Sequence, residues 1–215
     1  DVAADKKYDR IVSVQHGPCD IDCAPSLLEF SPELAPVFKA DSKNVVVLAD
    51  YLGYGSSRTS NLEHPYLHAA LTGSACTDML RAAETYLAAD AGFRYDDKSA
   101  VKKPISLCGY SQGGQGTIAT LYSLQEKGYT ARIDDVKAGG SPLNIIHIID
   151  SFLKMEKYDF MGYLVYTIRG LVYGNNLSVD LHNVYAPEVF SSGMDAKFNS
   201  TMITSWHKKL GTDGH

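Results

Sequence analysis

The ten residues from 105 to 114 constrain the fold more than any other segment. They read ISLCGYSQGG, an apolar run that leads directly into Gly-Tyr-Ser-Gln-Gly. A serine on a sharp strand-to-helix turn has strained backbone angles, so side chains two positions before and after it would collide. Gly109 and Gly113 stand at these positions. The segment predicts a strand, then Ser111 as a candidate nucleophile, then a helix through Leu124; the alternative is a glycine-rich turn without a catalytic role.

Three other short apolar runs are expected to be parallel central strands. They cover residues 10–15, 44–49 and, with a weaker pattern, 135–138. Apolar residues at every third or fourth position predict a helix over 68–89, between the second strand and the strand before Ser111. Strands that alternate with helices predict an α/β fold with a doubly wound, mostly parallel sheet. Ligands of such sheets bind at the carboxyl ends of the strands, which is where Ser111 lies.

The composition is that of an ordinary globular domain. The chain has 215 residues, of which 45% are hydrophobic and 21% are charged, enough for one unit with a sizeable core. The net charge of -5 and the absence of any run of Lys or Arg argue against nucleic acid as a partner. The longest weakly charged stretch, 160–173, contains Arg169 and is shorter than the roughly 20 residues that a membrane-spanning helix needs. We therefore expect no transmembrane segment.

The cysteine pattern indicates neither a disulfide scaffold nor a metal centre. Cys19 and Cys23 are close enough to form a disulfide, but no second Cys or His pair stands at zinc-ligand spacing. Cys76 falls in a helical pattern, and Cys108 is expected to be a small buried residue within a strand. We expect no metal and no cofactor. The first residues contain no apolar signal segment, so the protein is either cytoplasmic or had a signal removed before this numbering begins.

Residues suited to a reaction centre also follow the first predicted strand. His16-Gly17-Pro18 comes directly after it, and a flexible glycine there lets the backbone offer an N–H to an oxyanion. The backbone N–H of Gln112, next to the nucleophile, is the other expected donor, and the Gln112 side chain is not required for this role. His16 lies upstream of Ser111, so we expect it to orient or pack rather than to act as a base.

Five segments together resemble the α/β-hydrolase superfamily and, within it, the branch of bacterial esterases and secretory lipases. They are His16-Gly17, Asp50 to Gly55, His64 to Leu67, Asp78 to Ala83 and Gly109 to Gly114. The resemblance covers roughly residues 10 to 140. It implies a serine hydrolase that cleaves carboxylic esters. Ser111 would attack the ester carbonyl, the Gly17 and Gln112 amides would hold the oxyanion, and water would hydrolyse the acyl-enzyme. The branch also implies a secreted or periplasmic location.

The chain departs from this superfamily after its middle. The triad acid and base of the superfamily follow the serine, each on a loop after a further strand. After position 140 the patterns are helical or irregular, with helices expected over 145–153 and 158–173. We therefore divide the chain into an α/β-hydrolase core, 1–140, and a helical cap segment, 141–215. We expect the core to be partial and the acid and base to come from a complementary C-terminal chain, the product of cleavage or truncation.

Few residues of the chain itself could complete a triad. The candidate acids are Asp180 and Asp195, and the candidate bases are His182, His207 and His215. Asp195 with His207 has the order of the superfamily, although no strand pattern precedes Asp195. Asp50 precedes the serine and is expected to anchor a loop. His147 stands amid isoleucines and is expected to be a histidine of the core.

The cap segment gives a weak indication of the substrate. Its aromatic residues would form an apolar cover over the serine, which favours an acyl or aromatic ester or a lipid, although they could equally pack against the core. The leading interpretation is an esterase or lipase. The alternatives are a cutinase-like esterase, whose serine turn is similar but whose cysteine-flanked acid loop is missing, a serine peptidase, and a non-catalytic binding protein. An open sheet edge would make the chain alone poorly soluble or lead it to assemble.

Overall fold

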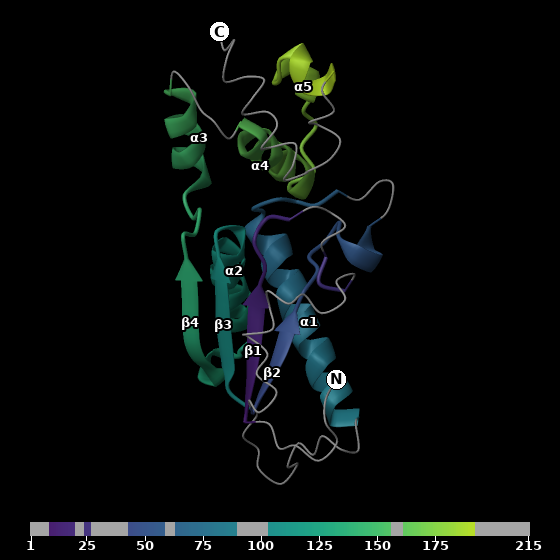
Figure 1. The fold of residues 1–215 in the computed structure, drawn as a ribbon, viewed down its shortest axis with the longest axis vertical. Coiled ribbons are helices and arrows are strands. Elements are labelled where there is room, and N and C mark those ends of the chain that lie inside the picture. Colours follow the sequence, from purple (N-terminus) through teal and green to yellow (C-terminus); the bar gives the residue numbers. More distant parts are fainter. Residues whose placement is uncertain are drawn as a thin grey trace.

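Four parallel strands form the centre of the molecule (Figure 1). They are β1 (Arg10–Gln15), β2 (Asn44–Leu48), β3 (Ile105–Tyr110) and β4 (Ile133–Gly139), in the order β2-β1-β3-β4. The computed structural model describes residues 9–19, 24–26, 43–58, 63–89, 103–155 and 161–191. All four strands lie where the sequence predicts them, and β4 begins two residues before the expected start. The predicted α/β class with a parallel sheet is confirmed.

Two long helices cover one face of this sheet. The helix α1 (Ala69–Ala89) connects β2 to β3, and α2 (Gln112–Glu126) connects β3 to β4. Both connections advance in the same direction along the sheet, so right-handed crossovers put both helices on the same face. Both lie behind the strands in Figure 1 and pack against each other and against the sheet. Both helices were predicted from the sequence, the second with its start directly after Ser111.

The apolar core lies between the sheet and these two helices. Its buried residues are Ile11, Val47, Leu80, Ile105, Leu107 and Leu124. Each large aliphatic side chain buried in this way contributes roughly 1.5–3 kcal/mol relative to an exposed one. The core therefore fixes α2, and with it the turn at its N-terminus, against β1 and β3.

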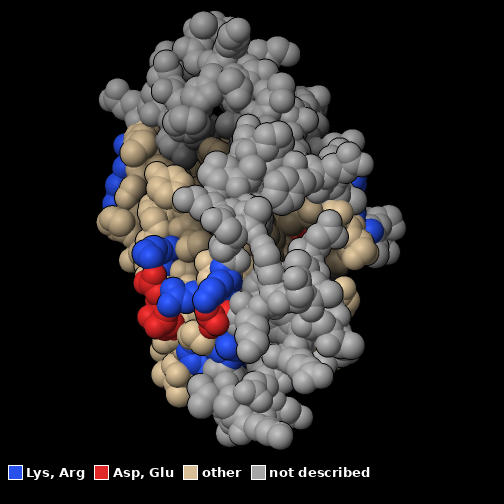
Figure 2. Space-filling model, turned by 60° about the horizontal axis from the view of Figure 1, so that its bottom comes forward, with Lys and Arg blue, Asp and Glu red and all other residues tan. Residues whose placement is uncertain are grey.

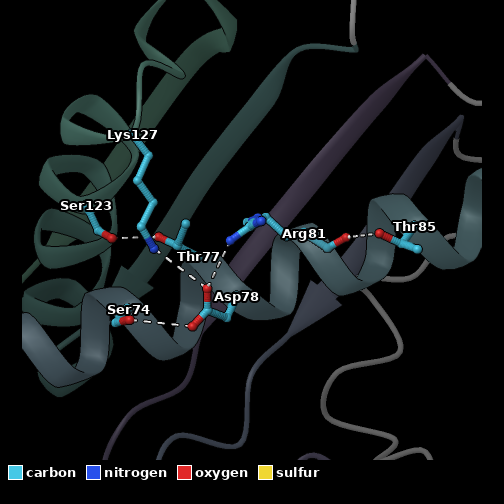
Figure 3. A network of polar contacts seen from close by, with 7 residues as sticks. All are labelled: Ser74, Thr77, Asp78, Arg81, Thr85, Ser123 and Lys127. Atoms are coloured by element: carbon cyan, nitrogen blue, oxygen red, sulfur yellow. Dashed lines mark hydrogen bonds and ion pairs between the residues drawn. The ribbon is translucent and has the colours of Figure 1, made fainter.

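Polar contacts tie α1 to α2 at the edge of this core (Figure 3). The Thr77 hydroxyl donates to the Ser123 hydroxyl at 3.0 Å. The Asp78 carboxylate lies 3.6 Å from the Lys127 ammonium and 3.8 Å from the Arg81 guanidinium. The Asp78, Arg81 and Lys127 side chains are 61%, 60% and 38% exposed, so these ion pairs contribute little and the buried core holds the helices together.

The other described helices follow β4. They are α3 (Ile145–Leu153), α4 (Met161–Gly174) and α5 (Pro187–Ser191), with short 3-10 turns η2 (Gly55–Ser57), η3 (Thr130–Arg132) and η4 (Leu181–Asn183). In Figure 1, α3, α4 and α5 lie beyond the carboxyl ends of the strands. No strand follows β4 within the described ranges, and none of the helices there is long and apolar enough to cross a membrane.

One expectation for this region is wrong. His147 is exposed rather than part of the core, because no residue of α3 is buried and its neighbour Ile146 is 82% exposed. Apolar neighbours in the sequence indicate burial only where the helix packs along its length against another element.

Charged side chains of both signs alternate at the other end of the sheet. Figure 2 shows Lys and Arg beside Asp and Glu on the described part of that surface. Arg10 pairs with Asp134 at 2.6 Å, and Lys43 lies 3.5 Å from Asp9. Paired charges of opposite sign create no extended field of one sign, which is what attracts a polyanion.

Candidate active site

Ser111 lies on a strained turn between β3 and α2. Its backbone angles are φ 57° and ψ -121°, in a region that non-glycine residues rarely occupy. Such a conformation costs on the order of 1–3 kcal/mol and persists only where the surroundings enforce it. Here the Ser111 N–H donates to the Gly139 carbonyl of β4 at 2.9 Å, and its carbonyl accepts from the Gln115 N–H at 3.1 Å. The strand-turn-helix geometry predicted from the sequence is therefore present.

The two glycines that flank this turn are required by close backbone contacts. A Cβ atom at Gly109 would lie 2.3 Å from the Gly113 carbonyl oxygen, and one at Gly113 would lie 2.1 Å from the Gln15 carbonyl oxygen. Both distances are far below van der Waals contact, and the obstructing atoms belong to the backbone. The absence of a side chain at Gly109 thus lets β3 and α2 approach each other, and its absence at Gly113 lets the turn lie against the end of β1.

The end of β1 lies beside this turn. In the parallel pairing of β1 with β3, Gln15 is opposite Gly109, so His16 and Gly17 continue alongside Ser111. The chain leaves β1 toward β2 and leaves β3 toward β4, on opposite sides of this pair. Such a reversal of direction opens a crevice at the carboxyl ends of the strands, where ligands of α/β proteins bind. The structure therefore brings Ser111, Gln112 and Gly17 to one end of the sheet.

His16 is held between two backbone carbonyls. Its Nδ1 lies 2.7 Å from the Gly17 oxygen and its Nε2 lies 3.2 Å from the Asp50 oxygen. Burial lowers the pKa of His16, and a neutral imidazole carries one N–H, so it can donate to one of the two carbonyls. The Tyr51 ring stacks on it at 4.1 Å between centroids, and the Tyr51 hydroxyl donates to the His16 carbonyl at 3.0 Å. These contacts orient the 16–17 segment.

Asp50 binds a neighbouring loop. Its carboxylate accepts hydrogen bonds from the Ser26 N–H, at 2.8 Å, and from the Ser26 hydroxyl. Both carboxylate oxygens are therefore used to hold residues 24–26 beside the end of β2. A loop anchor uses its carboxylate in this way, and Asp50 makes no hydrogen bond to Ser111.

The Gln112 side chain has a contact that the sequence did not reveal. It is completely buried, and its Nε2 lies 2.7 Å from Nε2 of His64. Nδ1 of His64 lies 2.8 Å from the Leu52 carbonyl oxygen. Burial lowers the pKa of His64 to about 3, so the ring is neutral at ordinary pH. Its Nδ1–H donates to Leu52, and its Nε2 accepts from the Gln112 amide.

The helix α4 contacts the segment 63–66 next to this pair. The Arg169 guanidinium of α4 makes a two-pronged ion pair with the Glu63 carboxylate. Three residues along the core segment, the Tyr66 ring contacts the Tyr166 ring of α4, with 4.9 Å between centroids. The segment that carries His64 is thus held by α4, by the Leu52 carbonyl and by the Gln112 side chain.

The candidate triad partners are not brought to Ser111 by the described residues. The Asp180 carboxylate accepts from the His182 N–H at 3.0 Å and begins η4, while the His182 ring stacks on Phe190 at 3.9 Å. Both are exposed, and neither is hydrogen-bonded to Ser111. Asp195, His207 and His215 lie outside the described residues, as does Cys23 of the expected disulfide. No group of three or more His, Cys, Asp or Glu side chains in the described ranges could hold a metal ion.

Comparisons with known proteins show the fold. No protein-family model matches the chain, and no curated protein matches it either. Among solved structures, a presumed hydrolase of Legionella pneumophila has a TM-score of 0.71 and 22% sequence identity over 93% of this chain. The rice cell wall degrading esterase LipA of Xanthomonas oryzae has a TM-score of 0.65 and 22% identity over 96% of it. The chain spans 53% and 54% of these two chains. The sheet and helices described above are thus part of an α/β-hydrolase fold.

Proposed function

We propose that this chain carries the nucleophile of a serine hydrolase that cleaves carboxylic esters, an esterase or lipase. The observation that supports the proposal most strongly is the strained Ser111 at the tip of the β3–α2 turn, enforced by backbone contacts to β1 and β4. Strain of this kind is retained where it serves function, because a relaxed turn would be more stable. The esterase that shares the fold supports the same class of reaction.

The reaction would proceed through an acyl-enzyme. The Ser111 oxygen attacks the ester carbonyl carbon while its proton passes to a general base, and the carbonyl electron pair moves onto the oxygen. The tetrahedral intermediate collapses, the bond to the alcohol oxygen breaks, and the alcohol leaves with the proton. Water then attacks the acyl carbon in the same way and releases the acid. We propose that Asp195 is the triad acid and His207 the base, or that both groups belong to a complementary C-terminal chain.

The oxyanion would be held by two backbone amides. Gln112 is the first residue of α2, and the N–H groups of a first helical turn have no acceptor within the helix. The positive end of the helix dipole adds to their attraction for an anion. Gly17 would supply the second N–H from the end of β1. The His16 carbonyl belongs to the same peptide as this N–H, and the Tyr51 hydroxyl donates to it at 3.0 Å.

We propose that residues 141–215 form a cap over this site and that the substrate is a small ester or lipid. The cap helix α4 supplies the half-buried Tyr163 and Tyr166, whose rings lie 6.5 Å and 4.9 Å from that of Tyr66. Aromatic side chains of this kind suit an acyl or aromatic group better than a charged metabolite. We also propose that the protein is secreted or periplasmic and that its ester substrate lies outside the cytoplasm.

The test is hydrolysis of matched substrates by the intact protein and by S111A. We expect p-nitrophenyl esters to be cleaved, the corresponding anilide to be cleaved far more slowly, and S111A to lose all hydrolysis above background. Faster cleavage of the anilide would favour a serine peptidase. A wild-type protein without activity toward either substrate would favour a binding protein that has the fold without the chemistry.

A further inference from the structure

A short chain of buried hydrogen bonds leads from the core to the residue after the proposed nucleophile. The Leu52 carbonyl fixes His64 through Nδ1, and Nε2 of His64 receives the Gln112 side-chain amide. His64 is 6% exposed and Gln112 is 0% exposed, so water does not compete for the bond between these two side chains. The two residues are 48 positions apart in the sequence. The pair therefore links the 50–64 loop directly to the serine turn.

This bond determines how the Gln112 side chain is held. Its other polar atom, Oε1, is buried and has no hydrogen-bond partner among the described residues. The Leu52 carbonyl sets the His64 tautomer, so Nε2 of the ring can only accept. A Gln112 amide turned the other way would place its oxygen against that lone pair. Only one orientation of the amide is compatible with the site.

Within the turn 111–114, the Gln112 side chain is also the only one available to hold the backbone in place. Ser111 must keep its hydroxyl for attack, and Gly113 and Gly114 have no side chains. Gln112 contributes the backbone N–H proposed as an oxyanion donor. Fixing its side chain therefore fixes the peptide that carries this N–H, and oxyanion donors act only when they are held in place before the reaction.

His64 in turn is held by aromatic rings. The Tyr54 ring meets it edge-on at 4.6 Å, and the Tyr51 ring lies parallel to it at 5.8 Å. The Tyr51 ring also stacks on His16, and the Tyr51 hydroxyl donates to the His16 carbonyl, which belongs to the peptide that carries the Gly17 N–H. Tyr51 therefore contacts both histidines and the peptide of the second proposed oxyanion donor.

We propose that His64 is a positioning residue, which holds the Gln112 backbone N–H toward the oxyanion by accepting a hydrogen bond from the Gln112 side chain. The proposal rests on the proposed function, because it concerns the same reaction. It assigns His64 no proton transfer: the ring stays neutral and acts through Gln112 alone.

Two substitutions at position 64 separate this role from a structural one. In H64Q the amide oxygen can replace Nε2 as the acceptor for Gln112. In H64N the shorter amide can still donate to Leu52 but cannot reach Gln112. We expect H64N to lower kcat about 10- to 100-fold with little change in KM, because the lost interaction acts in the transition state. We expect H64Q to retain most of the activity.

The Gln112 side of the bond provides an independent check. Q112M removes the side-chain amide while keeping the backbone N–H, and we expect it to lower kcat as much as H64N does. The double variant H64N/Q112M should be no worse than either single variant, because both remove the same interaction. Circular dichroism and melting temperatures establish that each variant is folded, and Q112M serves if H64N does not fold.

The outcomes distinguish the two proposals. Wild-type activity together with equal kcat values for wild type, H64N and Q112M would overturn the role of His64 and leave the proposed function intact. Equal losses in H64N and H64Q would also overturn it, because they would show that the Leu52 bond or the ring itself matters. A folded wild-type protein that neither hydrolyses esters nor reacts with a fluorophosphonate would overturn both proposals.

Discussion

Two glycines show how tightly the serine turn is packed against the rest of the sheet. A Cβ atom at position 109 would lie 2.3 Å from the Gly113 carbonyl oxygen, and this atom belongs to the backbone of α2. We therefore expect G109A to lower the free energy of unfolding by about 2–4 kcal/mol, because the strand and the helix must separate to admit the methyl group. Urea denaturation measures this loss.

Gly17 provides the control for stability. A Cβ atom there would meet only the Tyr110 carbonyl oxygen, at the ordinary contact distance of 3.7 Å. G17A should therefore unfold at the urea concentration of the wild type. Equal stability of G109A and the wild type would contradict the described packing of the turn.

His64, which is buried, and His16, which is partly buried, make stability depend on pH. The pKa of His64 falls to about 3 in the folded state, from the ordinary value of 6.5, and burial also lowers that of His16. Between these pH values the unfolded chain binds more protons than the folded one, so stability decreases as the pH falls from 6.5 toward 3. The slope for one such histidine is about 1.4 kcal/mol per pH unit.

Comparison of the wild type with H64Q isolates this effect. Carboxylates titrate equally in both proteins, so the difference in their unfolding free energies between pH 7 and pH 4 reports His64. We expect the curve of H64Q to be shallower by about one proton. Parallel curves would show that His64 is not neutral and buried in the folded protein.

At this scale the sequence predicted the steric part of the site and missed the long-range part. The requirement for small neighbours of Ser111 is local, so Gly109 and Gly113 reveal it directly. The bond between Gln112 and His64 is not local and leaves no periodic pattern in the sequence. The prediction that the Gln112 side chain is not required for the oxyanion role rested on the backbone amide alone, and Q112M tests it.

Among the elements, the parallel strands were predicted well because each has a short run of β-branched or other apolar residues in the sequence. The weakest prediction, β4, is paired on one side only in the described sheet, and none of its residues is fully buried. Its Asp135 and Lys137 form an exposed ion pair. Such charged residues interrupt the apolar pattern of a strand in the sequence, and in the fold they prevent an exposed strand edge from pairing with another chain. The helix α3 illustrates the opposite case, since it is apolar in sequence and exposed in the structure.

One ion pair joins elements from different parts of the chain. Glu84 of α1 pairs with Arg132 of η3, and their side chains are only 16% and 11% exposed. Arg132 also donates to the Lys103 carbonyl ahead of β3. We expect E84A to lower the free energy of unfolding by about 3 kcal/mol, because it leaves a buried guanidinium without its counter-charge.

The exposed pairs of Asp78 in Figure 3 supply the control for this prediction. Asp78 is 61% exposed, and its partners lie at 3.6 Å and 3.8 Å. D78A should cost less than about 1 kcal/mol. Equal effects of the two substitutions in urea denaturation would contradict the difference in burial between the two pairs.

For the whole molecule, the sequence predicted the class of fold and the turn that carries Ser111, but not a complete set of partners for the proposed nucleophile. The described sheet is open beside β4, and the chain spans about half of the two similar structures. The acid and base of the proposed triad come from distant positions in the sequence, and no local sequence pattern shows that they lie together in the fold. The proposal of a complementary C-terminal chain therefore requires a second polypeptide beside this chain, whereas the proposal of Asp195 with His207 does not.

The most direct test of the account is the intact mass of every polypeptide in the purified sample before and after reaction with a fluorophosphonate. We predict that this chain gains one label at Ser111 and that S111A gains none. A second polypeptide in the labelled sample would assign the acid and base to it, whereas labelling of this chain alone would assign them to residues such as Asp195 and His207. No label on the wild type, or an undiminished label on S111A, would contradict the assignment of Ser111 as the nucleophile.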